Sequence, residues 1–505
     1  MATKAASFFS PRRTARDRPW AIAVPATILA GAVLALLTMA RPIDHDEGQY
    51  VAAAILSWAH LPWRDFDYLQ TPLQPLLLAP LAQLAGGHAL LALRLANAAL
   101  TVATLSLLIG AQRRLGASPA MAVATGLLFL TIEPVLFAAT TARNDALPLA
   151  LEAATLALLA RLHTRPGARA GWLSFALGLV AMAAAAAKIS YLLPFASIML
   201  TGAWQQRRGR TPISPLPFAA GALAVLIPTL LLAGLAPGHA LFDVLEFPGR
   251  APAEWYRATG QSWRLTLDGR LITFAKFMML GPAPALIALC WARRERDDGR
   301  PIVAQLDGLI VAGIVAALLP APVWRQYLVP IMPPLLLRAG LALDGKMPGR
   351  AWRLAVAAGT MAGLGVSVWQ LGLAAAGGSP LLAAERSAAQ AAALVHERAP
   401  RGPVVTLSPE AAANAGAPLD ARFAAGPFLF RTRDGLGQDG RLIGVSRHSA
   451  PTRLGAHPPA AFVLGGATAD RDAPLDRMLA HWALTHGYRP ASPAGAPLLV
   501  LVRDR

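Results

Sequence analysis

Apolar runs of about 20 residues recur along most of the chain and constrain its fold more than any other feature. A helix needs about 20 such residues to cross the hydrocarbon core of a bilayer, and in lipid only helices and closed barrels satisfy their backbone polar groups. Eleven runs fit this requirement, at 20–40, 88–110, 119–137, 144–161, 171–187, 189–204, 216–236, 271–291, 302–320, 327–343 and 353–375. The sequence therefore predicts a polytopic α-helical membrane protein.

The composition supports this fold class and argues against a nucleic-acid partner. Of the 505 residues, 55% are hydrophobic and only 15% are charged, whereas about a quarter are charged in soluble domains. The net charge is +18, but the basic residues lie in short loops between apolar runs and not in one patch. With a single cysteine, Cys290, the chain has no intrachain disulfide.

Lysine and arginine are unequally distributed between alternate loops. If the N-terminus is cytoplasmic, the inner loops hold twenty of these residues and the outer loops hold nine. Because basic loops tend to stay in the cytoplasm, residues 1–19 are predicted to be cytoplasmic. The first span then places the loop 41–87 on the extracytoplasmic side of the inner (plasma) membrane. The odd number of spans places the C-terminal part on the same side.

The character of the sequence changes near residue 376, which divides a transmembrane domain (20–375) from an extracytoplasmic domain (376–505). Short apolar runs predict strands, and longer periodic segments predict helices. The strands are expected at 403–408, 460–466 and 497–502, and the helices at 381–398 and 475–487. This alternation predicts a small α/β domain. No G-x-G-x-x-G follows its first strand, so nucleotide binding is not predicted.

The first external loop, 41–87, is rich in acids. Asp44 and Glu47 have the D-x-x-E spacing of a capping box, which would begin a helix lying in the membrane interface. The apolar face of that helix comprises Val51, Ala54, Ile55 and Trp58. Capping does not account for Asp46, nor for Arg64, Asp65 and Asp67 farther along. We therefore treat these residues as functional candidates.

Further polar groups lie at the outer ends of other predicted spans or in outer loops. They are Arg143-Asn144-Asp145, Lys188, Arg325 with Tyr327, and the loop 237–270, which includes Arg257. Capping by Asn144 or Asp145, snorkelling of Lys188 and interfacial anchoring of the aromatic and loop residues are alternative explanations. Yet the predicted topology puts all these groups on the same face as Asp46. Cations there suit a lipid phosphate and a carboxylate suits a general base, which predicts group transfer from a lipid phosphate to a hydroxyl or amine.

Several of these segments resemble the GT-C glycosyltransferases, in particular lipid A aminoarabinose and galacturonic acid transferases and protein O-mannosyltransferases. The segments are DEGQY, DYLQTPLQPLLL, RNDALPL, AAKISYLLP and RQYLVPIMPPLLL, in this order, over roughly residues 20–345. The resemblance implies an inverting transferase with a GT-C fold. Its donor would be a sugar linked to a polyprenyl phosphate, and its acceptor a lipid, glycan or protein on the outer side.

The resemblance also implies roles for individual residues. Asp46 would be the base that activates the acceptor, beside Glu47, and Asp145 would position the acceptor or the base. The ligands of the donor phosphate would be Lys188, Arg325 and Tyr327. Possible further substrate contacts are Asp44, Tyr50, Arg64, Asp67, Gln70, Arg143, Asn144 and Arg257.

One position departs from the aminoarabinose transferases. They carry Glu-Lys-Pro where this chain has Gln70-Thr71-Pro72, so a carboxylate and a cation are missing here. Other members of the superfamily bind a divalent cation with acids of the first loop. A divalent cation is thus possible in this chain, and the sequence defines no other cofactor.

A transporter or a lipid-linked glycan flippase is the main alternative. It should have paired broken helices and ionisable residues near the bilayer midplane, often in internal repeats. This sequence has no internal repeat, and its charges lie at one predicted face. A purely structural membrane protein leaves the external acids unexplained. A transferase instead predicts that Asp46, Asp145, Lys188 and Arg325 converge in one outward cavity.

The predicted topology can be tested with fusions. An alkaline phosphatase fused after Arg505 should be active, because that position is predicted to lie outside the cytoplasm. The same reporter inserted in the predicted cytoplasmic loop 205–215 should be inactive. The reverse pattern would contradict the face assigned to every candidate residue.

Overall fold

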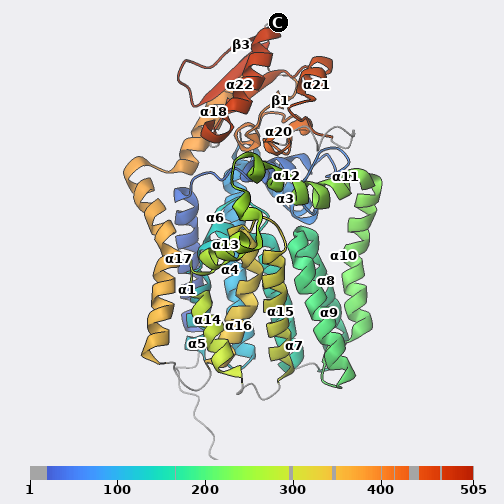
Figure 1. The fold of residues 1–505 in the computed structure, drawn as a ribbon, viewed down its shortest axis with the longest axis vertical. Coiled ribbons are helices and arrows are strands. Elements are labelled where there is room, and N and C mark those ends of the chain that lie inside the picture. Colours follow the sequence, from blue (N-terminus) through green and yellow to red (C-terminus); the bar gives the residue numbers. More distant parts are fainter. Residues whose placement is uncertain are drawn as a thin grey trace, which may run out of the picture.

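The computed structural model describes residues 20–164, 167–294, 300–343, 349–399, 401–414, 416–431, 443–466 and 469–503. The predicted cytoplasmic segment 1–19 lies outside these ranges. A bundle of long helices forms one part of the molecule, and the C-terminal domain caps one end of it (Figure 1). Shorter helices of the first loop and of the segment around α12 lie between the two parts (Figure 1).

Within the described ranges, seven segments are long and apolar enough to cross a membrane. They contain α1 (Trp20–Ala40), α4 (Ala89–Arg114), α7 (Ala146–Thr164), α8 (Ala170–Ala187), α10 (Pro215–Leu235), α15 (Pro301–Leu318) and α17 (Arg350–Gly377). Each corresponds to one of the predicted spans, so the polytopic helical fold is confirmed.

Two other predicted spans are bent helix pairs and not straight helices. α5 (Pro119–Phe129) and α6 (Glu133–Thr140) meet at 73°, and α13 (Leu267–Met278) and α14 (Ala283–Ala292) meet at 93°. In both pairs the second helix has a proline in its first turn, where the missing N–H costs nothing. Two shorter helices, α9 (Leu192–Arg207) and α16 (Met332–Ala342), cover the remaining predicted spans. The total of eleven spans therefore stays a prediction.

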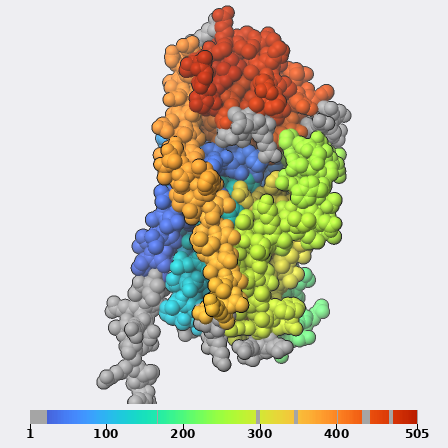
Figure 2. Space-filling model, turned by 60° about the vertical axis from the view of Figure 1, so that its left-hand side comes forward, coloured from blue at the N-terminus to red at the C-terminus, as the bar shows by residue number. Residues whose placement is uncertain are grey.

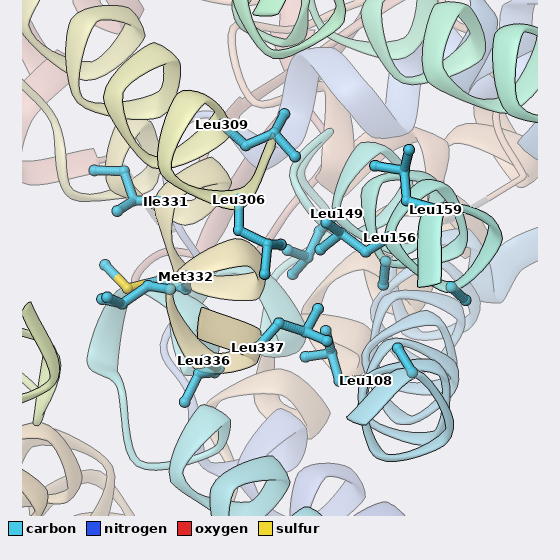
Figure 3. Packing of buried hydrophobic residues seen from close by; sticks show 14 of the residues in the cluster. Leu108, Leu149, Leu156, Leu159, Leu306, Leu309, Ile331, Met332, Leu336 and Leu337 are labelled. Carbon is cyan, nitrogen blue, oxygen red and sulfur yellow. The ribbon is translucent and has the colours of Figure 1, made fainter. Parts of the chain in front are cut away.

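The centre of the bundle is a dry hydrophobic core (Figure 3). Leucines of α4, α7, α15 and α16 meet there; those labelled in Figure 3 are Leu108, Leu149, Leu156, Leu159, Leu306, Leu309, Leu336 and Leu337. Ile331 and Met332 continue this packing toward the site end of the bundle. The core thus fixes the ends of these helices that face the C-terminal domain, and the candidate residues extend from those ends.

Helices α8 and α10 approach each other through a pair of glycines. A Cβ atom added at Gly178 would lie 1.9 Å from the carbonyl oxygen of Phe218, and one added at Gly221 would lie 1.9 Å from that of Phe175. Small residues allow such close backbone packing between membrane helices. The contact therefore leaves no room for any side chain at either position.

The first external loop folds into α2 (Glu47–Leu56) and α3 (Leu73–Ala85). Half of the expected capping box forms, because the Glu47 carboxylate accepts the Asp44 N–H at 2.9 Å. The apolar face of α2 does not lie in the membrane interface as predicted. Val51 and Ala54 are instead buried in a cluster with residues of α3 and α4 and with Leu381 and Ala413 of the C-terminal domain, while Trp58 is 58% exposed. Burial inside the protein replaced burial in lipid.

The C-terminal domain is α/β, as predicted. Its sheet has the order β1-β2-β4-β3, with β1 and β2 parallel and the other pairs antiparallel. The strands are β1 (Val404–Val405), β2 (Ala461–Gly465), β3 (Tyr488–Pro490) and β4 (Leu498–Arg503). The helices are α18 (Pro380–Arg398), α19 (Pro409–Ala413), α20 (Phe428–Arg431), α21 (Ala450–Ala456) and α22 (Ala469–Thr485). The strand β3 and the helices α19, α20 and α21 were not predicted.

The C-terminal domain packs on the first external loop through α19 and α2, and in Figure 2 the blue surface lies below the orange and red surface of the domain. Ser379 donates to the carbonyl oxygen of Met39 at 2.6 Å, and Asn414 accepts the N–H of Leu90 at 2.7 Å. Gly48 of α2 lies under α19, where a Cβ atom would come within 2.5 Å of a Glu410 carboxylate oxygen. The domain is therefore an integral part of the molecule and not a tethered appendage.

Gly221→Ala should lower the melting temperature in detergent, because the new methyl group meets backbone atoms that cannot rotate away. Overpacking of this kind costs about 1–3 kcal/mol. Gly234→Ala is the matched control on the same helix, since no atom of the described chain lies within 4 Å of the added Cβ. That variant should be neutral or slightly more stable. Equal melting temperatures for the two variants would contradict the close α8–α10 contact.

Candidate active site

A cavity of about 360 Å³ opens between the bundle, the first external loop and the C-terminal domain. Of the predicted residues, those that line it are Asp44, Asp46, Tyr50, Gln70, Arg143, Lys188, Arg325 and Tyr327. Predicted residues from four separate connecting segments thus meet at one site. Asp145 does not reach the cavity surface but lies directly behind Lys188 and Arg143.

Arg143 joins the acids of this site. Its Nη1 donates to Asp44 Oδ1 at 2.8 Å and to Asp46 Oδ2, and its Nε donates to Asp145 Oδ2 at 3.2 Å. Arg143 follows the end of α6, whereas Asp44 and Asp46 precede α2. Because the guanidinium is only 3% exposed, it fixes the first loop against the bundle with little screening by water.

Lys188 extends this network to a third element. It is the C-cap of α8, is buried, and donates through Nζ to Asp145 Oδ1. Its ammonium also lies 5.8 Å from the centre of the Tyr327 ring. Three carboxylates and two cations therefore form one connected network, which makes up the acidic wall of the cavity with Asp145 behind it and has an excess of negative charge when His45 is neutral.

The adjacent wall, where Arg325 lines the cavity, has the reverse balance. Arg325 donates to Glu133 Oε1 at 2.9 Å, and Arg41 lies 3.6 Å from the same oxygen. Both walls contact the ring of Phe137, with the Arg325 guanidinium 3.5 Å and that of Arg143 5.3 Å from its centre. Two cations share one carboxylate here, so this wall has net positive charge. The cavity thus presents an acidic and a basic surface side by side.

Asp46 is ionised in this setting. Burial disfavours its charge, but Arg143 and His45 outweigh that effect and hold the pKa of Asp46 well below its ordinary value. His45 Nε2 lies 3.0 Å from Asp46 Oδ1. The carboxylate is therefore available to accept a proton at neutral pH, and its geometry is fixed by partners on both oxygens.

The remaining lining of the cavity is largely apolar. α12 (Phe247–Ala258) turns one face toward it, which consists of Phe247, Pro248, Ala251, Pro252 and Trp255. α20 of the C-terminal domain adds Phe428 and Arg431. The Phe428 ring lies 6.1 Å from that of His45, and the Arg431 guanidinium lies 5.7 Å from the centre of the Trp255 ring. The C-terminal domain is thus part of the cavity wall.

Other predicted residues lie away from the cavity. Glu47 is fully buried and pairs with Arg94 at 2.6 Å, which gives it a structural role. Arg64 is half exposed and pairs with Asp65, and Arg257 is exposed on α12. Asn144 is buried and donates to Gln70 at 3.3 Å. Sequence order alone does not separate these residues from those that line the site.

Several lining or supporting residues were not predicted, namely Arg41, His45, Glu133, Phe137 and Phe428. A signal existed for Glu133, because an acid inside a predicted span is a functional candidate by default. His45 lies between two residues that were considered. The bend between α5 and α6 brings Phe137 to the site, and the docking of α20 brings Phe428. The sequence predicted neither.

Within the part of the chain that the structure describes, Asp44, His45 and Asp46 form a group whose ligand atoms lie close enough together for a metal, within 4.8 Å of one another. Arg143 already bonds to both carboxylates through one nitrogen. A divalent cation bound there would lie beside a buried guanidinium, and like charges at that range repel strongly. The set therefore fits Arg143 and does not fit a divalent cation.

Comparisons with known proteins identify the fold. No protein-family model and no curated protein matches the chain. A crystal structure of ArnT from Cupriavidus metallidurans bound to undecaprenyl phosphate is similar with a TM-score of 0.63 and 17% identity, over 95% of this chain and 98% of that chain. The apo structure of the same protein gives a TM-score of 0.61 and 17% identity, over 95% and 97%. The chain thus shares the fold of ArnT over 95% of its length, which agrees with the fold implied by the resemblance.

A third solved structure is similar over a smaller part. It is the S. cerevisiae protein O-mannosyltransferase Pmt1-Pmt2 complex bound to the sugar donor, with 17% identity and a TM-score of 0.34 over 43% of this chain and 33% of that chain.

Asp67 holds the C-terminal domain next to the site. Its carboxylate accepts the N–H of Ile443 at 3.3 Å and that of Gly444. Burial raises the pKa of Asp67 to about 6, although those two N–H groups oppose the shift. Burial and the neighbouring Asp67 also raise the pKa of Asp243 well above its ordinary value, and Asp243 accepts the N–H of Tyr68 at 2.8 Å. Ionisation of this buried pair is therefore unfavourable.

We expect Asp67→Asn to gain stability relative to the wild type as the pH rises from 4.5 to 7.5. Because the folded pKa exceeds the ordinary 3.8, Asp67 contributes its full stability below that pH and loses it as the pH rises through about 6. The relative gain is at most roughly 3 kcal/mol. Asp65→Asn is the control, since Arg64 lowers the pKa of Asp65 below 3.8 and keeps it ionised over this range. The assignment would be contradicted if the melting temperature changed by the same amount between the two pH values for the wild type and for Asp67→Asn.

Proposed function

We propose that this protein is a membrane glycosyltransferase that moves a sugar from a polyprenyl-phosphate donor to an extracytoplasmic acceptor. The observation that carries the proposal is the pairing of an acidic and a basic wall in one cavity, at the outer ends of the spanning helices. The ArnT fold supports it, because one ArnT structure is described as bound to undecaprenyl phosphate.

The basic wall suits the donor phosphate. Arg325 lines the cavity, its side chain is 31% exposed, and its partner Glu133 already serves a second arginine. Tyr327 and Lys188, the latter from the adjacent acidic wall, complete this binding site in the proposal, although Asp145 already compensates the charge of Lys188. The apolar face of α12 beside them suits the polyprenyl chain.

The acidic wall suits the acceptor. In the proposed reaction the acceptor oxygen attacks the anomeric carbon from the face opposite the phosphate, and its proton passes to Asp46. The bond between that carbon and the phosphate oxygen breaks, and the phosphate leaves with the electron pair and one more negative charge. Inversion follows from attack opposite the leaving group. Arg325 and Lys188 stabilise the phosphate where this charge develops.

The proposal is tested by donor binding and sugar transfer in detergent. Asp46→Asn should lower the transfer rate about 10²–10⁴-fold, the usual contribution of a general base. Binding of a polyprenyl monophosphate should be retained, because that ligand contacts the other wall. A folded Asp46→Asn variant with near-normal turnover would remove Asp46 from the mechanism.

Two further variants test the acidic wall and the basic wall separately. Asp44→Asn should be mild, because Asn keeps an oxygen for Arg143 and for the N–H of Asp46. Arg325→Gln should weaken polyprenyl-phosphate binding by about tenfold or more, the value of a lost charge-assisted hydrogen bond. Arg325 is a cleaner choice than Lys188, whose removal leaves Asp145 buried without that cation. Binding of the lipid without any sugar transfer by the wild type would favour the flippase.

A further inference from the structure

Glu133 serves two arginines with one oxygen. It begins α6, is fully buried, and its Oε1 lies 2.9 Å from Arg325 Nη1 and 3.6 Å from Arg41 Nη1. Arg325 lines the cavity, whereas Arg41 follows α1 and does not. The Arg41 guanidinium lies 5.5 Å from the centre of the Phe137 ring, on which Arg325 also stacks. The carboxylate thus lies between a cation that can meet a ligand and one that cannot.

The contact between Glu133 and Arg41 is incomplete. Glu133 Oε2 and the Nε and Nη2 atoms of Arg41 are buried, and none of them has a hydrogen-bond partner in the described part of the chain. Burial lowers the pKa of Arg41 to about 10, against the opposing effect of Glu133. Buried polar atoms without partners are costly, and more so when they are charged. A two-bond pairing of Glu133 with Arg41 would satisfy these atoms.

We infer that Glu133 is an exchangeable counter-ion, which pairs with Arg325 in the arrangement described and moves to Arg41 when an anionic phosphate takes Arg325. The inference rests on the proposed function, because it takes the donor phosphate to be the ligand of Arg325. Arg41 is then a positioning residue, which affects the phosphate without touching it.

The physical reason is the cost of an unpaired buried charge. A phosphate that takes Arg325 competes with Glu133 for the same guanidinium. Without Arg41, the displaced carboxylate would stay buried with no cation, which is strongly unfavourable. With Arg41 in place, the carboxylate exchanges one partner for another. Arg325 is then fully available while the leaving phosphate gains its second charge.

A double-mutant cycle tests this exchange in the full-length protein, with a polyprenyl monophosphate as the probe. Arg41→Gln should weaken binding about tenfold or more, because Glu133 then has no other cation and stays on Arg325. Glu133→Gln should bind at least as tightly as the wild type. The double variant should return to within about threefold of the wild type, since coupled residues give non-additive changes.

Two other results would overturn the inference. If Arg41→Gln binds the probe with wild-type affinity, Glu133 does not need Arg41 as an alternative partner. If the losses of affinity in the two single variants add in the double variant, with no rescue, the cluster has a role in stability alone. Melting temperatures check that each variant is folded. If Arg41→Gln does not fold, the single variant Glu133→Gln still tests the exchange, because weaker binding of the probe by that variant would exclude it. The proposed function is tested separately, because it fails if the wild type does not bind the probe or if Arg325→Gln binds it equally well.

Discussion

The buried guanidinium of Arg143 is the contact on which the site depends. It bonds to Asp44 and Asp46 in the first external loop and to Asp145 at the start of α7. A buried arginine with three carboxylates is stable only if all the partners stay in place, since removal of one side leaves uncompensated charge. Arg143 therefore couples the loop to the bundle and sets the charge state of Asp46 at the same time. The fold and the proposed chemistry rest on the same side chain.

The two walls of the cavity also solve an electrostatic problem. A base and a phosphate-binding cation would neutralise each other if they paired directly. Here Asp46 is matched to Arg143 and Arg325 to Glu133, and both guanidinium groups contact the Phe137 ring. The proposed base and the proposed phosphate-binding cation can thus lie within one small cavity without pairing with each other. A mobile surface loop would not hold such a separation, which explains why helix ends supply most of the groups.

Much of this arrangement could be predicted from the sequence, because membrane topology reduces the possibilities. Once the spans and their direction are assigned, Asp46, Arg143, Lys188 and Arg325 must lie at one face. Hydropathy does not predict bends, however, so the turn before α6 that brings Glu133 and Phe137 to the site was missed. Nor does it predict how domains dock, and α2 was therefore assigned to lipid instead of to the C-terminal domain. Arg64 and Arg257 were included because sequence position does not tell which way a helix faces.

The C-terminal domain is held by apolar packing and by a few hydrogen bonds. Tyr50, Phe66 and Tyr68 of the first external loop share a buried cluster with residues of its sheet. Asp67 bonds to the N–H groups of Gly444 and Ile443, Asn414 to that of Leu90, and Ser379 to the carbonyl oxygen of Met39. These contacts constrain a limited set of positions, so the domain can diverge elsewhere without losing its place. Because α20 forms part of the cavity wall, a substitution at Phe428 or Arg431 would reshape the cavity while these contacts stay unchanged.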